Sequence, residues 1–165
     1  MPSIIDVTVA MWDANRERTL ATLAAIEALP NPQQALGWRP GPGRAHIAWQ
    51  LTHIGITEEL FATERLANTK PDYADLVPRF KGGSTPDDNI PAASQIREIL
   101  SHSREHLKKT IAAMSDADLS RVPDFGMLRE RNWPIGRALQ VINWHECHHQ
   151  GQAHITLNLY KAAHA

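Results

Sequence analysis

The feature that most constrains the fold is the spacing of apolar residues at steps of three and four along four separate stretches of the chain. In the first stretch, this spacing connects Ile5, Trp12, Leu23 and Ile26. Such spacing lines up apolar side chains on one face of an α-helix, and no stretch has the alternation typical of a β-strand. The sequence therefore predicts an all-α protein.

Proline residues indicate where the predicted helices begin and end. Pro30 and Pro32 follow the first apolar stripe and end that helix. Pro91 and Pro134 suit the first turn of a helix, where the missing N–H does no harm. We therefore expect four helices, at residues 3–29, 44–68, 91–114 and 132–161.

The predicted second and third helices are separated by a long polar connection, residues 69–90, which is rich in proline and glycine. It is too long for a tight turn between antiparallel neighbours. We expect it to cross the molecule, so that these two helices run parallel. Four long helices with one long crossover predict a four-helix bundle.

Length and composition limit the classes of function. A chain of 165 residues is predicted to form one domain, residues 1–165. Its net charge of −1 gives no electrostatic attraction to nucleic acid or to an anionic membrane. It lacks the run of about 18 apolar residues that a membrane span needs. The single cysteine, Cys147, and a first segment without signal-peptide features predict a cytoplasmic location.

Residues 144–152 hold three histidines, and two of them are spaced for metal binding. His145 and His149 are four residues apart, which puts both side chains on one face of a helix. We expect both in the middle of the inward stripe, with Cys147 on the opposite side. Two imidazoles so arranged can bind one metal ion. His53, on the apolar face of the predicted second helix, is the best candidate for a third ligand.

These histidines could instead have only a packing role without metal, because histidine is often half-buried with a hydrogen bond to a neighbour. Two observations favour metal binding over a packing role. An unpaired polar group in an apolar stripe costs about 1–3 kcal/mol, and a third inward histidine lies on another helix. His148 is expected to pack beside the site, and His154 to lie outside it.

A second pair, His102 and His106, has the same four-residue spacing. These residues are expected off the apolar stripe of their helix, towards solvent. Arg104, Lys108 and Lys109 are close in sequence and disfavour a cation. We therefore do not expect a native metal site at this pair.

Two segments resemble a known family. Residues 145–152, His-Glu-Cys-His-His-Gln-Gly-Gln, resemble the H-x-x-H-H-x-G-Q signature of the DinB-like superfamily. Residues 46–54 resemble the helix that carries this family's first ligand. The resemblance implies an up-down-down-up bundle, a metal site whose ligands map onto His53, His145 and His149, and a homodimer. Several relatives look like metal-dependent transferases of low-molecular-weight thiols.

Two functions are consistent with such a site. Three histidine ligands leave a coordination position open for water or a small-molecule substrate, as in catalytic zinc sites. Zn²⁺ or Ni²⁺ is expected first, with Fe or Mn as alternatives. The metal would lower the pKa of a thiol or a water, as a thiol S-transferase or a related hydrolase requires. The alternative is a non-enzymatic stress-response module with a structural or sensory metal.

Three polar residues are candidates to assist the metal: Glu64, Gln152 and Arg16. Arg16 lies inside the apolar stripe of the first helix. A buried guanidinium could hold the carboxylate of a cosubstrate. The favoured alternative is that its stem packs while its head reaches solvent.

Apolar residues off the main stripes suggest how a homodimer would form. Ile54 and Phe61, on the predicted second helix, are expected to face outward and form part of the dimer surface. The alternative is that they only widen the contact of this helix with the core.

Overall fold

The computed structural model describes residues 1–164, and all of the regular secondary structure in this range is helical, as predicted. The segments in chain order are α1 (Ile4–Glu27), α2 (Pro32–Gly37), α3 (Ile47–Leu60), a π-helical turn (Phe61–Arg65), α4 (Val77–Phe80), α5 (Ala93–Ile111), a 3₁₀ turn (Asp116–Ser120), α6 (Gly126–Glu130) and α7 (Ile135–Ala163). The four long helices correspond to the four predicted ones. The short helices lie in the connections and were not predicted.

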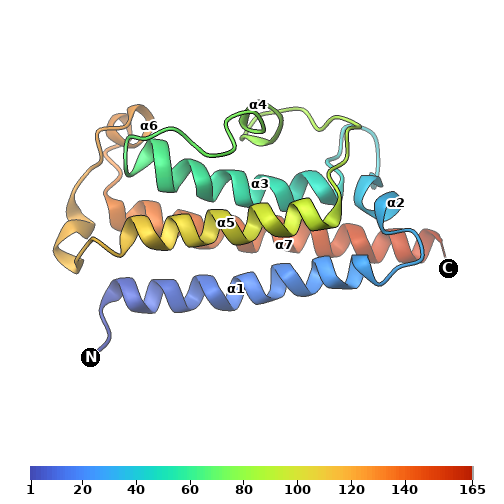
Figure 1. Cartoon of the computed structure of the whole chain (residues 1–165), viewed down its shortest axis with the longest axis horizontal. Coiled ribbons are helices and arrows are strands. Elements are labelled where there is room, and N and C mark those ends of the chain that lie inside the picture. The colour runs from blue at the N-terminus through green and yellow to red at the C-terminus, as the bar shows by residue number, and fades with distance from the viewer. Residues whose placement is uncertain (165) are drawn as a thin grey trace.

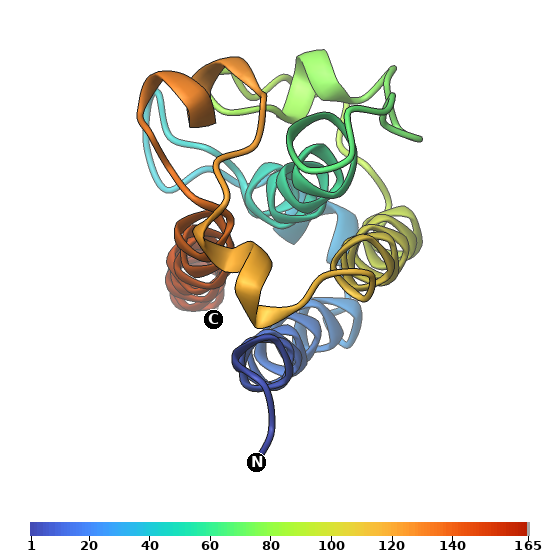
Figure 2. The same cartoon turned by 90° about the vertical axis from the view of Figure 1, so that its left-hand side faces the viewer.

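The four long helices lie side by side along the long axis of the molecule (Figure 1). α3 and α5 run in the same direction, and α1 and α7 run in the opposite direction. The end view shows the four axes around one interior, with the connection that contains α4 lying over α3 (Figure 2). The long connection therefore crosses the molecule, from the end where α3 stops to the end where both α3 and α5 begin, as its length predicted. No helix in the described range is long and apolar enough to cross a membrane.

Two of the predicted helix boundaries shift because of the local backbone. α3 begins after His46, whose Nδ1 accepts a hydrogen bond from the Trp49 backbone N–H at 3.0 Å and so caps the helix. α7 begins at Ile135 and not at Asn132. Asn132 has a φ of 51°, a left-handed conformation that a right-handed helix does not contain.

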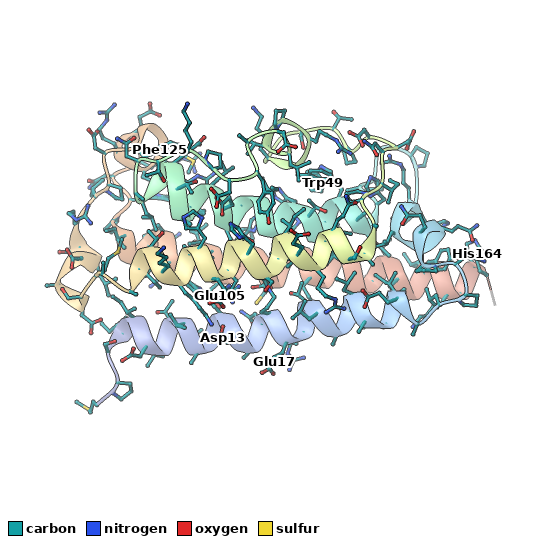
Figure 3. All side chains as sticks on the ribbon, in the orientation of Figure 1. Asp13, Glu17, Trp49, Glu105, Phe125 and His164 are labelled. Carbon is teal, nitrogen blue, oxygen red and sulfur yellow. The ribbon has the colours of Figure 1, made fainter. Side chains whose placement is uncertain are left out.

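Every residue of α3 is buried. α5 and α7 pack on two of its sides, and the connection between α3 and α5 covers the remaining face. Phe80 from α4 packs there in one apolar cluster with Trp49, which Figure 3 labels. Ile54 and Phe61 are buried in the core of the same chain, with 0% and 2% exposure. The prediction that these two residues face outward is therefore wrong, and they widen the core contact.

α3 and α5 approach each other closely at Gly55. A Cβ atom at this position would lie 2.8 Å from Cγ2 of Ile99, a buried side chain of α5. By contrast, a Cβ atom at Gly151, inside α7, would meet nothing within 4 Å. The two helical glycines therefore differ in their packing and not in their backbone conformation.

Four buried charged side chains, one from each long helix, meet between the helices. Arg16 of α1 contacts Glu146 of α7 at 2.7 Å and Glu58 of α3 at 2.7 Å. Arg104 of α5 contacts Glu58 at 2.5 Å and also pairs with Glu146. All four residues are buried. We call these four residues the buried charge network.

The buried charge network corrects the interpretation of Arg16. Its head does not reach solvent, because the residue is only 7% exposed and both sides of the guanidinium are bound to protein groups. A further bond runs from Nη1 to the backbone oxygen of Leu100. Arg16 therefore has its carboxylate partners within the chain and is not free to hold a cosubstrate.

The two arginines also set the ionisation of Glu58. Burial on its own raises the pKa of this carboxyl, but the charges and hydrogen bonds of Arg16 and Arg104 outweigh it and hold the pKa below its ordinary value. A carboxyl whose pKa is lower when folded stabilises the protein above its unfolded pKa of about 4.3. That stability is lost as the pH falls through the folded pKa.

Gly55→Ala should destabilise the protein by about 1–3 kcal/mol, because the added methyl group forces α3 and α5 apart. Gly151→Ala is the matched control in another helix, and it should stabilise by about 0.5–1 kcal/mol because alanine favours the helix. Urea unfolding followed by circular dichroism measures both. Equal stability of the two variants would contradict the close approach at Gly55.

Arg104→Met should destabilise the protein by about 3–5 kcal/mol, because it leaves buried carboxylates without one of their two cations. Arg97→Met is the control on the same helix. Arg97 pairs with Glu27 at 2.5 Å, but both side chains are partly exposed, so its loss should cost at most about 1 kcal/mol. The same unfolding experiment applies, and similar losses for both variants would argue against the network.

Candidate metal centre

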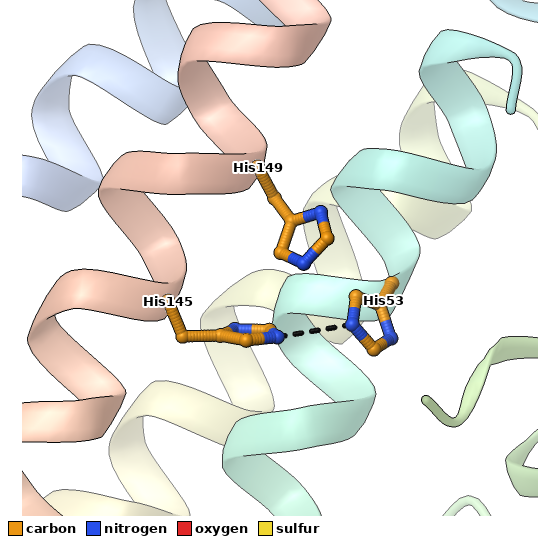
Figure 4. Close-up of side chains that lie close together, drawn as sticks. All are labelled: His53, His145 and His149. Carbon is orange, nitrogen blue, oxygen red and sulfur yellow. Dashed lines mark hydrogen bonds between the residues drawn. The ribbon is translucent and has the colours of Figure 1, made fainter. Parts of the chain in front are cut away.

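Three imidazole rings meet between α3 and α7. His53 comes from α3, and His145 and His149 come from successive turns of α7 (Figure 4). The ring centroids are 4.5–4.7 Å apart, and one nitrogen of each ring lies within 4.8 Å of the others. Two nitrogens bound to one tetrahedral zinc ion are about 3.3 Å apart. The structure therefore brings together the three predicted ligands, which we call the histidine triad, at nearly the spacing of a metal site.

The position of the triad on α7 differs from the prediction. The buried stripe of this helix runs through Leu139, Ile142, Glu146 and Leu157, so a glutamate and not a histidine lies at its centre. His145 and His149 lie at the edge of the stripe, facing α3, and both are only half-buried. His53 is buried. Two of the three residues thus keep part of their surface in solvent, and the third is buried.

Hydrogen bonds on the far side of two rings fix their orientation. Nδ1 of His53 lies 2.6 Å from the backbone oxygen of Phe80, and Nδ1 of His149 lies 2.5 Å from Oε1 of Gln50. Each of these oxygens can only accept, so each Nδ1 carries the proton and each Nε2 carries a lone pair. Metal-binding histidines are commonly held by such bonds. Trp49 stacks on His53, with ring centroids 4.5 Å apart, and limits the movement of that ring.

The surroundings of the triad keep the rings neutral. Burial, followed by the charges of the neighbouring rings, lowers the pKa of His145 to about 2 and that of His149 to about 3. Burial also lowers the pKa of His53, against the effect of its bond to Phe80. Neutral imidazole is the form that binds a metal. At neutral pH the rings are therefore uncharged. Nε2 of His53 accepts a hydrogen bond from Nε2 of His145 at 2.9 Å, so this one proton has to leave Nε2 of His145 before all three Nε2 atoms can bind a cation.

A cation from the chain lies near the triad. The charge of Arg65, in the π-helical turn after α3, contributes to the lowered pKa of His53 and of His145. This arginine is half-buried, and its Nε is buried without a hydrogen-bond partner among the described residues. A buried N–H group of this kind can be satisfied by an anionic ligand.

None of the three predicted helper residues is hydrogen-bonded to a ring of the triad in the described range. Gln152 donates a hydrogen bond to Nε2 of the exposed His148 at 2.7 Å. Glu64 is half-buried in the π-helical turn and is not among the groups that surround the three rings. Arg16 belongs to the buried charge network. Cys147 is exposed on the opposite side of α7, as expected.

Sequence reasoning missed Gln50, Arg65 and the backbone oxygen of Phe80. Gln50 had a detectable signal, because it is a polar residue one turn before His53 on a helix otherwise rich in apolar residues. Arg65 follows the predicted ligand by twelve positions and lies in the π-helical turn after α3, so the periodicity of a regular helix did not indicate it. Phe80 acts through its backbone at the end of the short helix α4, so no side-chain pattern could indicate it.

Comparison with known proteins identifies the family. A model of the DinB superfamily matches residues 11–153, a range that includes all three histidines of the triad. The chain belongs to the DinB superfamily. Among solved structures, it is similar to a DinB-like protein from Bacillus cereus ATCC 10987, with a TM-score of 0.59 and 18% identity over 90% of this chain and 89% of that one. At this identity the likeness shows the fold alone. No curated protein matches the chain.

His149→Ala should reduce the bound Zn²⁺ by one ion per chain, because two imidazoles and water hold zinc much more weakly than three imidazoles. His154→Ala is the control, since His154 is an exposed histidine of the same helix. Protein without a histidine tag is loaded with Zn²⁺, dialysed and analysed by mass spectrometry of the metal. Equal metal content in wild type and His149→Ala would exclude the triad as the site.

Proposed function

We propose that this protein is a metal-dependent enzyme that transfers a low-molecular-weight thiol to an electrophile, or a related hydrolase. The triad would bind one divalent ion, Zn²⁺ or Ni²⁺ in preference to Fe or Mn. The observation that carries the proposal is the composition of the site. Three neutral imidazoles converge there, and no carboxylate or thiol joins them among the described residues. Catalytic zinc sites have this arrangement, whereas structural sites have a fourth protein ligand.

The donor set fits the metal. Nε2 of His53 and of His149 is free of protons because the opposite nitrogen donates to Phe80 or Gln50. When bound, a divalent ion supplies Lewis-acid chemistry that lowers the pKa of a thiol or a water to near neutrality. The chain contributes by holding two of the rings in a fixed orientation. Trp49 shields one face of His53 from water.

The arginine beside the triad favours thiol transfer over hydrolysis. In place of Arg16, we assign to Arg65 the role of holding an anionic group of the cosubstrate. Its charge already acts on two of the histidines, and its Nε has no partner among the described residues. Low-molecular-weight thiols of cells commonly carry a carboxylate, which a guanidinium binds well. Hydrolysis by water would need no such cation.

A groove next to Gln50 offers room for the rest of a small-molecule substrate. Its volume is about 300 Å³, and Arg44, Gln152, Ile155 and Thr156 are among its lining residues. Gln50 belongs both to this groove and to the hydrogen bond that holds His149. We propose that the groove binds the part of the thiol or electrophile that does not react, with Arg44 at its edge as a second cation.

The alternative function is a non-enzymatic stress-response module in which the metal is structural. One observation favours it: exposed apolar residues, among them Val7 and Met11 of α1 and Trp144 and Leu159 of α7, offer a surface for protein contact. We propose that these residues, in place of Ile54 and Phe61, contribute to a homodimer. A cytoplasmic location suits either function, since the exposed Cys147 is a free thiol.

A thiol-transfer assay tests the enzyme. The Zn²⁺- or Ni²⁺-loaded protein is mixed with L-cysteine, glutathione or bacillithiol and with monochlorobimane, and thioether formation is followed by fluorescence. p-Nitrophenyl acetate without thiol tests hydrolysis. His149→Ala should lower the rate at least about tenfold, since the loss of even an outer partner of a metal ligand costs that much.

The control for this assay is His154→Ala, which should keep the wild-type rate. Arg65→Gln should raise KM for the carboxylate-bearing thiol and leave the hydrolytic rate unchanged. Equal rates for wild type and His149→Ala in both assays would contradict an enzymatic role. A structural metal would then be the better account of the triad.

A further inference from the structure

A second group of metal-binding side chains lies apart from the triad. His102 and His106 come from successive turns of α5, Glu59 comes from α3, and Asp72 comes from the connection that follows α3. One ligand atom of each residue lies within 4.8 Å of the others. The pair of histidines has the same four-residue spacing as His145 and His149. We call these four residues the second cluster.

The buried member of the second cluster is a carboxylate. The side chain of Glu59 has 0% exposure, and among the described residues its ion-pair partner is His106, at 3.1 Å from Oε2. Oε1 accepts a hydrogen bond from the backbone N–H of Asp72 at 2.9 Å. A fully buried carboxylate requires a compensating cation. Neither a lysine nor an arginine is paired with Glu59 in the described range.

The other two ligands complete a mixed donor set. Nε2 of His102 lies 2.8 Å from Oδ2 of Asp72, and Nδ1 of His106 lies 3.7 Å from the same oxygen. Two carboxylates and two neutral imidazoles together carry the charge that a divalent cation balances. Nitrogen and oxygen donors in this combination suit first-row ions such as Zn²⁺, Fe²⁺ and Mn²⁺.

The structure removes the main objection to this pair that the sequence raised. Arg104 points into the bundle, where it binds Glu58 and Glu146, and does not face the second cluster. Lys108 pairs with Asp13 of α1, labelled in Figure 3, at 2.7 Å. Of the neighbouring cations, Lys109 alone lines the open groove of about 370 Å³ that contains His102 and His106.

We propose that Glu59, Asp72, His102 and His106 form a second binding site for a divalent first-row cation. The ion would tie the connection to α3 and α5, because Asp72 belongs to the connection and the other three ligands to those helices. The same connection carries Phe80, whose backbone oxygen orients His53. The ion would therefore have a structural role, in holding the connection that orients His53. The rival account is a protonated His106 paired with Glu59 and no metal.

Zn²⁺ binding to a variant without the triad tests the proposal. In His145→Ala/His149→Ala, isothermal titration at pH 7.5 should detect one Zn²⁺ per chain. Adding His102→Ala, an exposed position of α5, should weaken that binding at least about tenfold. Glu59→Gln should do the same, because it keeps the oxygen that accepts from Asp72 and removes the charge. His154→Ala in the same background removes an exposed histidine outside both clusters and should change nothing.

A second measurement covers the case in which the variant without the triad fails to fold. In the otherwise wild-type protein, metal analysis after loading with Zn²⁺ should find one ion fewer per chain in His102→Ala than in His154→Ala. Zn²⁺ should also slow proteolytic cleavage within residues 69–90, and His102→Ala should abolish this protection. Absence of Zn²⁺ binding outside the triad, or binding unchanged by both His102→Ala and Glu59→Gln, would overturn the proposal and favour the His106–Glu59 ion pair.

Discussion

Each of the four long helices contributes one charged side chain to the buried charge network, and the arrangement of the bundle depends on how these charges meet. Arg16 and Arg104 each contact both Glu58 and Glu146, so every charge has two opposite partners. Such a network is not automatically a gain in free energy, because desolvating the charges offsets much of their attraction. The network does fix the rotation of each helix about its own axis, because turning any one helix would separate a buried charge from its partners.

The buried charge network also determines where the candidate metal site lies. Glu146 turns towards the bundle interior, so its neighbours in sequence must point elsewhere: His145 faces α3, and Cys147 faces solvent. His149, one turn later, follows His145. The same helix thus presents a buried anion to the arginines and, about 100° away, two neutral imidazoles to His53. On α3, the network holds Glu58 while the connection holds His53 through the Phe80 backbone oxygen.

The sequence predicts the long helices and the triad, but not which charged and apolar residues are buried. Helical spacing predicted the long helices, and the four-residue step of His145 and His149 predicted two members of the triad. The sequence places the histidines at the centre of the α7 stripe because a buried Glu146 looks like a surface residue until its partners on α1 and α5 are known. The prediction that the head of Arg16 reaches solvent is wrong for the same reason, because its carboxylate partners lie on two other helices. Periodicity alone predicts Ile54 and Phe61 to face outward, because it does not reveal that the connection after α3 covers this helix.

Anomalous X-ray diffraction from crystals of the protein loaded with Zn²⁺, recorded on both sides of the zinc absorption edge, would show directly whether the histidine triad binds a metal ion. We expect an anomalous peak between α3 and α7, about 2.0–2.1 Å from one nitrogen of each of His53, His145 and His149. The remaining position should hold water or a small ligand. A zinc-loaded crystal with no peak at the triad, or with a fourth protein side chain closing its coordination, would contradict the account.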